Sequence, residues 1–241
     1  MSALAADDRP FDFTPIQTSD LPPTPTRDRN IAATAWVEAP AELLQLGELL
    51  GRVHNQASTW SLPRHFHRHA LDAEGLMGER PFWGPFWKAG SLSETQRSRF
   101  TAIRLQIFEI LSQLPTHPDG FSLIHADLHP GNVVMNDQRL HLIDFDDAGF
   151  GWHAYDLAVA LKDYQDHPRF EDFRAALILG YQSVRPVHEQ MLDLIPLFLL
   201  IRALASIGWA EARPELDLDD YPARLAAYAE ERAGSVLAPF V

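Results

Sequence analysis

Three polar residues, Asp127, Asn132 and Asp144, follow one another at a spacing that phosphoryl-transfer chemistry uses. Asp127 supplies a carboxylate that can orient a hydroxyl nucleophile. The amide oxygen of Asn132 and the carboxylate of Asp144 can hold Mg²⁺ on the phosphates of a nucleotide, because this hard cation prefers oxygen ligands. The residue types and their spacing therefore predict a phosphoryl-transfer site within residues 123–161.

A short β-hairpin is predicted to carry the chain from Asn132 back to Asp144. Its strands are expected at Val133–Met135 and Leu140–Ile143, with residues 136–139 as the turn. The hairpin would bring the amide and the second carboxylate to the same end of the element.

Helices are predicted on both sides of this hairpin. Apolar residues at helical spacing indicate one helix from Pro40 and another from Ser93, where Ser93 and Gln96 have capping-box spacing. A short strand is predicted at Ile31–Val37. The later helices are expected to begin near Asp156, Arg169, Pro186 and Asp220. This order predicts an α+β fold that is mainly α-helical.

The segment His125-Ala126-Asp127-Leu128-His129-Pro130-Gly131-Asn132 resembles the catalytic loop of protein kinases, and Ile143-Asp144-Phe145-Asp146 stands where they carry the metal-binding D-F-G motif. With Tyr155-Asp156-Leu157-Ala158 downstream, residues 41–229 resemble the aminoglycoside phosphotransferase and choline kinase-like family. The resemblance implies a protein-kinase-like fold, of which this chain carries the helical C-terminal lobe. It also implies transfer of the γ-phosphoryl group of ATP, with Mg²⁺, to a hydroxyl of a small-molecule acceptor.

The resemblance also implies a role for each polar residue of the site. Asp127 would be the catalytic carboxylate, although an aspartate that only caps the loop is the alternative. Asn132 and Asp144 would bind the metal and the nucleotide, and Asp146 would add a further metal contact. His129 stands where protein kinases have a lysine, so it is either catalytic, donating a hydrogen bond to the phosphoryl group, or structural.

Two residues are assigned to structural support. His125 precedes the loop beside apolar residues, so we expect a buried histidine that bonds to the backbone. Asp156 is expected at the N-cap of a helix. In the family that the chain resembles, the matching aspartate braces the catalytic loop.

A metal-dependent hydrolase is a rival interpretation. His125, Asp127 and His129 have the alternate spacing of zinc ligands along a strand. Against it, Pro130-Gly131 breaks the strand, and no second histidine cluster follows in the expected region. Another alternating trio is predicted to be a surface loop; it consists of His65, His67 and His69.

Two apolar segments of the sequence each allow two structural interpretations. One group of aromatic residues either lines the acceptor pocket or covers the helical core; it comprises Phe82, Trp83, Phe86 and Trp87. Residues 191–210 are long and apolar enough to span a membrane, but Asp193, Pro196 and Arg202 interrupt them. Because charges inside the hydrocarbon are costly, a buried helix is predicted instead.

The composition of the chain limits the kinds of molecule that it is expected to bind. The net charge of −13 argues against nucleic acid and anionic membranes, and it favours a cationic acceptor such as an amine. There is no cysteine, which excludes disulfides and thiolate chemistry and agrees with a cytoplasmic location. The N-terminus has neither the basic flank nor the apolar core of a signal peptide.

The nucleotide-binding half of the resemblance is missing. It needs a glycine-rich loop and a lysine on a following strand, but the first glycine here is Gly47 and the only lysines are Lys88 and Lys162. We therefore expect residues 1–40 to be an irregular arm or a remnant of that lobe, and residues 41–241 to be the helical lobe.

Three functions follow from this gap. The first is a small-molecule kinase, either active in an unusual form or inactive alone. The second is a non-catalytic pseudokinase or binding module, and the third and weakest is the metal-dependent hydrolase. The surface that the nucleotide lobe would cover is expected to be apolar and to drive self-association or bind a partner chain.

Overall fold

The computed structural model describes residues 40–136, 139–216 and 218–240. The predicted strand at Ile31–Val37 and the rest of the predicted arm up to residue 39 lie outside the described residues. The α-helices are α2 (Pro40–Thr59), α3 (Ala73–Met77), α4 (Glu94–Gln113), α5 (His153–Leu161), α6 (Phe170–Gln182), α7 (Glu189–Asp193), α8 (Ile195–Glu211) and α9 (Tyr221–Leu237). Short 3-10 helices are η2 (Phe86–Lys88), η3 (Pro130–Asn132), η4 (Lys162–Tyr164) and η5 (Ala238–Phe240).

Two small sheets flank the predicted site. In the first, β5 (Gly149–Trp152) pairs antiparallel with β2 (Phe121–Ile124) and parallel with β1 (Ala70–Leu71). The second is the predicted hairpin, formed by β3 (Val133–Asn136) and β4 (Arg139–Leu142). The hairpin is thus confirmed. β1 and β5 were not predicted from the sequence. β1 has only two residues, and two of the four residues of β5 are glycines, so neither strand shows an alternating pattern.

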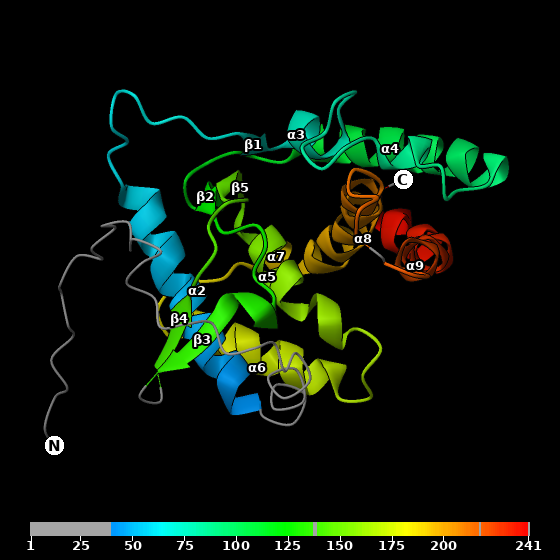
Figure 1. Cartoon of the computed structure of the whole chain (residues 1–241). Helices are drawn as coiled ribbons and strands as arrows, with labels where there is room; N and C mark the ends of the chain where they lie inside the picture. Colours follow the sequence, from blue (N-terminus) through cyan, green and yellow to red (C-terminus); the bar gives the residue numbers. More distant parts are fainter. Residues whose placement is uncertain (1–39, 137–138, 217, 241) are drawn as a thin grey trace, which may run out of the picture.

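Helices α2 and α6 lie side by side, with the hairpin next to α2 (Figure 1). Their backbones approach very closely at two glycines. A Cβ atom on Gly47 would lie 1.9 Å from the carbonyl oxygen of Leu177, and one on Gly180 would lie 1.8 Å from that of Leu44. No side chain fits at either place, so glycine at both positions is what allows this helix pair to pack.

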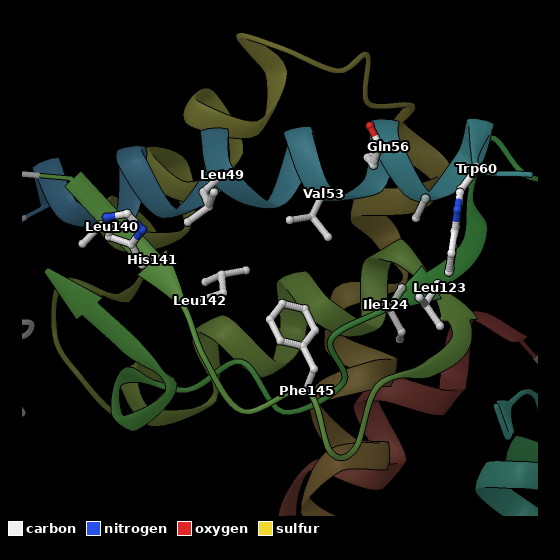
Figure 2. Close-up of a pocket in the computed structure, with 11 residues that line it drawn as sticks. Leu49, Val53, Gln56, Trp60, Leu123, Ile124, Leu140, His141, Leu142 and Phe145 are labelled. Atoms are coloured by element: carbon white, nitrogen blue, oxygen red, sulfur yellow. The ribbon is translucent and has the colours of Figure 1, made fainter. Parts of the chain in front are cut away.

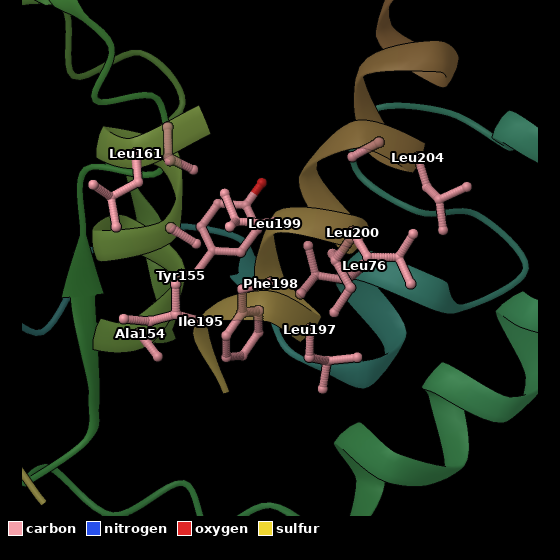
Figure 3. Packing of buried hydrophobic residues seen from close by; sticks show 14 of the residues in the cluster. Leu76, Ala154, Tyr155, Leu161, Ile195, Leu197, Phe198, Leu199, Leu200 and Leu204 are labelled. Carbon is pink, nitrogen blue, oxygen red and sulfur yellow. The ribbon is translucent and has the colours of Figure 1, made fainter. Parts of the chain in front are cut away.

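The centre of the core lies between α5 and α8, whose apolar side chains face one another in Figure 3. All nine residues of α5 are buried. The ring of Tyr155 on α5 meets that of Phe198 on α8 edge to face at 5.8 Å between centroids. Residues 189–211 are long and apolar enough to cross a membrane, but two thirds of the apolar window is buried inside the protein. The prediction of a buried helix is therefore confirmed.

Three helix starts can be compared with their predictions. The capping box of Ser93 and Gln96 is present at the start of α4. Asp156 was predicted as an N-cap, which is wrong, because α5 begins at His153 and its cap is Trp152. The helix predicted from Pro186 is in fact two helices, α7 and α8. Pro196 lies in the first turn of α8, where its missing N–H costs nothing, whereas it could not continue α7.

Candidate active site

The loop that follows β2 is fixed by the carboxylate of Asp156 on α5. One oxygen of Asp156 accepts from the backbone N–H of His125 at 2.9 Å, and the other accepts from that of Ala126 at 2.7 Å. Ala126 has a φ of +68°, a left-handed conformation that alanine rarely adopts. The two hydrogen bonds that the fully buried carboxylate accepts offset this strain and fix where the loop turns towards Asp127.

A buried network supports Asp156 from behind. His54 on α2 places its Nε2 3.1 Å from Asp156 and its Nδ1 2.8 Å from the hydroxyl of Tyr181. Burial alone would raise the pKa of Asp156. The hydrogen bond and charge of His54, together with His125, outweigh burial and lower that pKa. Asp156 therefore stays an acceptor for the loop.

Asp127 is half-buried and has several partners. The amide nitrogen of Asn132 donates to the backbone oxygen of Asp127 at 2.8 Å and contacts its Oδ2 at 3.3 Å. Arg202 on α8 donates to its Oδ1. Burial raises the pKa of Asp127, but His129 and Arg202 outweigh burial and lower that pKa below its ordinary value. The carboxylate is thus held ionised.

His129 faces Asp127 from within the same loop. Its Nδ1 accepts from the backbone N–H of Gly131 at 3.0 Å, so Nε2 is the ring nitrogen that carries the proton. That Nε2 lies 3.5 Å from Oδ2 of Asp127. The geometry therefore directs the His129 proton towards the loop carboxylate.

The arrangement of Asn132 and Asp144 suits a magnesium ion. Because the amide nitrogen of Asn132 is bonded to Asp127, its oxygen is the atom left for a cation. Asp144 is exposed and has a φ of +64°, and Asp146 lies exposed two residues further on. Mg²⁺ is usually bound by one or two carboxylates together with substrate phosphates, so this donor set fits the ion.

The segment around Asp144 is joined to the rest of the site by backbone contacts. His125 is fully buried, as expected, and its Nε2 lies 3.0 Å from the carbonyl oxygen of Ile143. Arg68 donates to the carbonyl oxygens of Phe145 and Asp146 at 3.3 and 2.9 Å. No motif pointed to this role for Arg68, which lies in the segment predicted to be a surface loop.

The structure locates the histidine trio and the group of four aromatic residues. In the histidine trio, His65 and His67 are exposed, whereas Nε2 of His69 lies 3.1 Å from the carbonyl oxygen of Asp147. Among the described residues, no three His, Asp or Glu side chains are placed to hold a metal together, as a zinc site would require. Of the four aromatic residues, Trp83, Phe86 and Trp87 belong to the core, whereas Phe82 is exposed.

Trp83 joins the core to the site. Its indole N–H donates to Asp147 at 3.2 Å, and its ring lies 5.3 Å from the guanidinium of Arg202. Sequence reasoning used Arg202 only to argue against a membrane helix. The sequence feature that could have pointed to this role is a single charge inside the apolar run of α8, because a charge in a buried helix requires a partner.

Two hollows adjoin the site. A polar cavity of about 360 Å³ lies between η4, α8 and α9; its lining includes Lys162, Asp163, Asp166, Arg202, Tyr221 and Arg224. On the other side, an apolar groove lies between α2 and the hairpin. Figure 2 shows Leu49 and Val53 of α2 pointing across this groove towards Leu142 and Phe145.

Comparison with known proteins gives consistent matches. A model described as the phosphotransferase enzyme family matches residues 19–194. The chain is 28% identical over 174 residues to amicoumacin kinase of Bacillus subtilis (strain 168), covering 68% of this chain and 49% of the relative. It is 32% identical over 198 residues to homoserine kinase of Gluconobacter oxydans (strain 621H), covering 73% and 58%. The chain thus spans about half the length of these curated relatives.

Solved structures agree with these relatives. A microcompartment-associated aminopropanol kinase superposes with a TM-score of 0.69 at 26% identity, over 82% of this chain and 62% of that one. The amicoumacin kinase hAmiN, solved with AMP-PNP, Ca²⁺ and Ami, superposes with a TM-score of 0.65 at 22% identity, over 81% and 59%. The second match concerns the fold alone.

Proposed function

This chain belongs to the phosphotransferase enzyme family, and on that premise we propose that it transfers the γ-phosphoryl group of ATP to a hydroxyl of a small molecule. Its relatives are small-molecule kinases, and its kinase-like α+β fold is the one predicted. The observation that carries the proposal is the loop carboxylate of Asp127, which His129 and Arg202 keep ionised and which Asn132 contacts from the same loop. The proposed location is the cytoplasm.

In the proposed reaction, the acceptor oxygen forms a bond to the γ-phosphorus while the bond from that phosphorus to the β–γ bridging oxygen breaks. ADP leaves with the electron pair of that bond. The hydroxyl proton passes to Oδ2 of Asp127, since Oδ1 is bound by Arg202 and the contacts of Oδ2 are long. Such a loose transfer depends on orientation more than on a strong base, which suits a carboxylate of low pKa.

Mg²⁺ would be held by Asn132 and Asp144, with Asp146 as a further carboxylate, and when bound it would neutralise charge on the phosphates. The role of this chain is to keep those oxygens in place. His125 does so through the carbonyl of Ile143, and Arg68 does so through the carbonyls of the two residues after Asp144.

The acceptor is proposed to be an amino alcohol that enters the polar cavity beside Arg202. Homoserine and aminopropanol, which the names of two similar proteins give, each carry an amino group and a hydroxyl. The net charge of −13 attracts a cationic molecule to the surface. Within the cavity, Asp163 and Asp166 are the carboxylates that an ammonium group would approach.

Thermal unfolding with and without Mg²⁺–ATP tests the proposal before any acceptor is known. Ligand at a hundred times its Kd adds about 2.7 kcal/mol, which corresponds to roughly 5–10 °C for a chain of this size. Asp144→Asn should lose this shift, whereas Asp119→Asn, on an exposed aspartate outside the catalytic loop, should keep it. A panel of amino alcohols then identifies the acceptor by release of ADP.

The alternative proposal is a binding module that has lost catalysis, and the apolar groove favours it. Ile143 and Phe145 beside Asp144 are both more than a third exposed, although a nucleotide-binding protein would be expected to cover them. Neither lysine of the chain lies on a strand, since Lys88 is in η2 and Lys162 in η4. Absence of any thermal shift at millimolar ATP would favour this alternative and count against the kinase.

A further inference from the structure

Arg202 reaches the site from an apolar helix, and the proposed reaction leaves open why a charged residue stands there. It lies in the middle of α8, a helix whose other residues at this level are apolar and buried. Only 14% of its side chain is exposed. Burial of a charged group is costly unless the group is paired, so a guanidinium at this position requires compensating contacts.

Its hydrogen bonds go to the catalytic loop. One terminal nitrogen donates to the carbonyl oxygen of Ala126 at 3.2 Å, and the other donates to Oδ1 of Asp127. The guanidinium also lies over the ring of Trp83. Arg202 thus bonds to two successive residues of the loop, one through the backbone and one through the side chain.

This pairing completes a clamp on the strained residue Ala126. Asp156 accepts from the N–H on one side of that residue, and Arg202 donates to the C=O on the other. Both backbone polar atoms of Ala126, the residue just before Asp127, are therefore held by side chains. Because Arg202 also holds Oδ1, the carboxylate cannot rotate freely, and Oδ2 remains the oxygen for an acceptor.

We propose that Arg202 is a positioning residue: it orients the Asp127 carboxylate from α8 and presents Oδ2 to the acceptor entering from the adjoining cavity. This inference rests on the proposed role of Asp127. Arg202 is also part of the wall of that cavity, so the residue that orients the carboxylate borders the space where the acceptor would lie. A lysine could not replace it fully. A single ammonium lacks the two terminal nitrogens with which the guanidinium reaches the carbonyl oxygen of Ala126 and Oδ1 of Asp127 at once.

The first test does not need enzymatic activity. The chemical shift of the Asp127 carboxyl carbon, followed by NMR against pH in the full chain, gives its pKa. We expect a value below the ordinary range in the wild type and a higher value in Arg202→Met, because the guanidinium that bonds to Oδ1 is gone. The control is Arg213→Met, since Arg213 also lies over a tryptophan and bonds to a carbonyl, but has no contact with the loop.

Equal values in the wild type and Arg202→Met would overturn the inference. If Arg202→Met does not fold, Arg202→Gln replaces it. Arg202→Gln keeps an N–H donor but loses the charge, so the pKa of Asp127 should rise in this variant as well.

The second test applies once an acceptor is found. Arg202→Lys should lower kcat by about tenfold to a hundredfold, the effect of a misplaced catalytic group, with little change in KM for ATP. If kcat falls equally in Arg202→Lys and Arg213→Met, and by no more than their loss of stability explains, the role of Arg202 is structural only. If no acceptor is phosphorylated, the proposed function fails, while the NMR titration still decides whether Arg202 holds Asp127.

Discussion

Asp127 is the residue on which the chemistry depends, so its neutral isostere gives the sharpest test at the scale of single residues. Asp127→Asn should keep the hydrogen bond from Arg202, because an amide oxygen also accepts, but it can no longer take the hydroxyl proton. We expect kcat to fall by about 10²–10⁴-fold, while the thermal shift with Mg²⁺–ATP persists. An activity within tenfold of the wild type would mean that Asp127 only caps the loop.

His153 provides a test of pH dependence. It is fully buried, it bonds to Ser122 through Nε2 at 2.8 Å, and it stacks on His54 at 4.1 Å. Burial, followed by the charges of His54 and Arg185, lowers the pKa of His153 far below its ordinary value. The folded state therefore binds one proton fewer than the unfolded state below pH 6.5, and folding loses stability as the pH falls.

We expect the free energy of unfolding to drop by about 1.4 kcal/mol per pH unit between pH 6 and 5 from this group. Urea unfolding across that range measures it. His153→Gln should flatten the slope, because glutamine does not titrate there. His117→Gln should leave it unchanged, since His117 is exposed. A wild type whose stability does not change over this range would contradict the expectation.

At the scale of elements, the close pair formed by α2 and α6 sets the position of the His54 network. Gly180→Ala should destabilise the protein by about 1–3 kcal/mol, because its Cβ would collide with the carbonyl oxygen of Leu44. Gly234→Ala in α9 is the matched control. Nothing lies within 4 Å of that position, so alanine should stabilise the helix by about 0.5–1 kcal/mol. Chemical denaturation of both variants would measure the two effects, and a neutral Gly180→Ala would show that the helices can move apart.

Elements with a strong local signal were predictable from the sequence. The hairpin has alternating strands, and α4 has a capping box, so neighbouring residues determine each of them. The strands β1 and β5 are too short for a pattern and exist through pairing with β2. The start of α5 was misplaced because Asp156 uses its carboxylate for the loop rather than for its own helix.

The residues of the site also include some that were predictable from the sequence and some that were not. Asp127, Asn132 and Asp144 were recognisable because they lie within eighteen residues of one another in a motif. Arg68 and Arg202 were not, because tertiary packing brings them to the loop from distant parts of the chain. Spacing along the sequence carries no information about such contacts.

At the scale of the whole molecule, the apolar groove beside α2 is the surface that we propose to drive self-association. At tens of micromolar, light scattering should give a mass above the 27.2 kDa of one chain. The double variant Leu49→Glu/Val53→Glu should restore the monomer mass. Leu105→Glu, on an exposed leucine of α4, should not. A wild type that is monomeric under these conditions would show that the groove does not pair with a second copy.

The ion pair between Asp127 and Arg202 crosses the boundary of the family match, which ends at residue 194, just before α8 begins. The family model therefore covers the loop but not the arginine that bonds to it. Two proteins can share every loop residue and still differ in whether an arginine stands behind the carboxylate. Transfer of an activity between such proteins should consider both parts, and the position that corresponds to Arg202 offers a way to sort them into subgroups before any substrate is assayed.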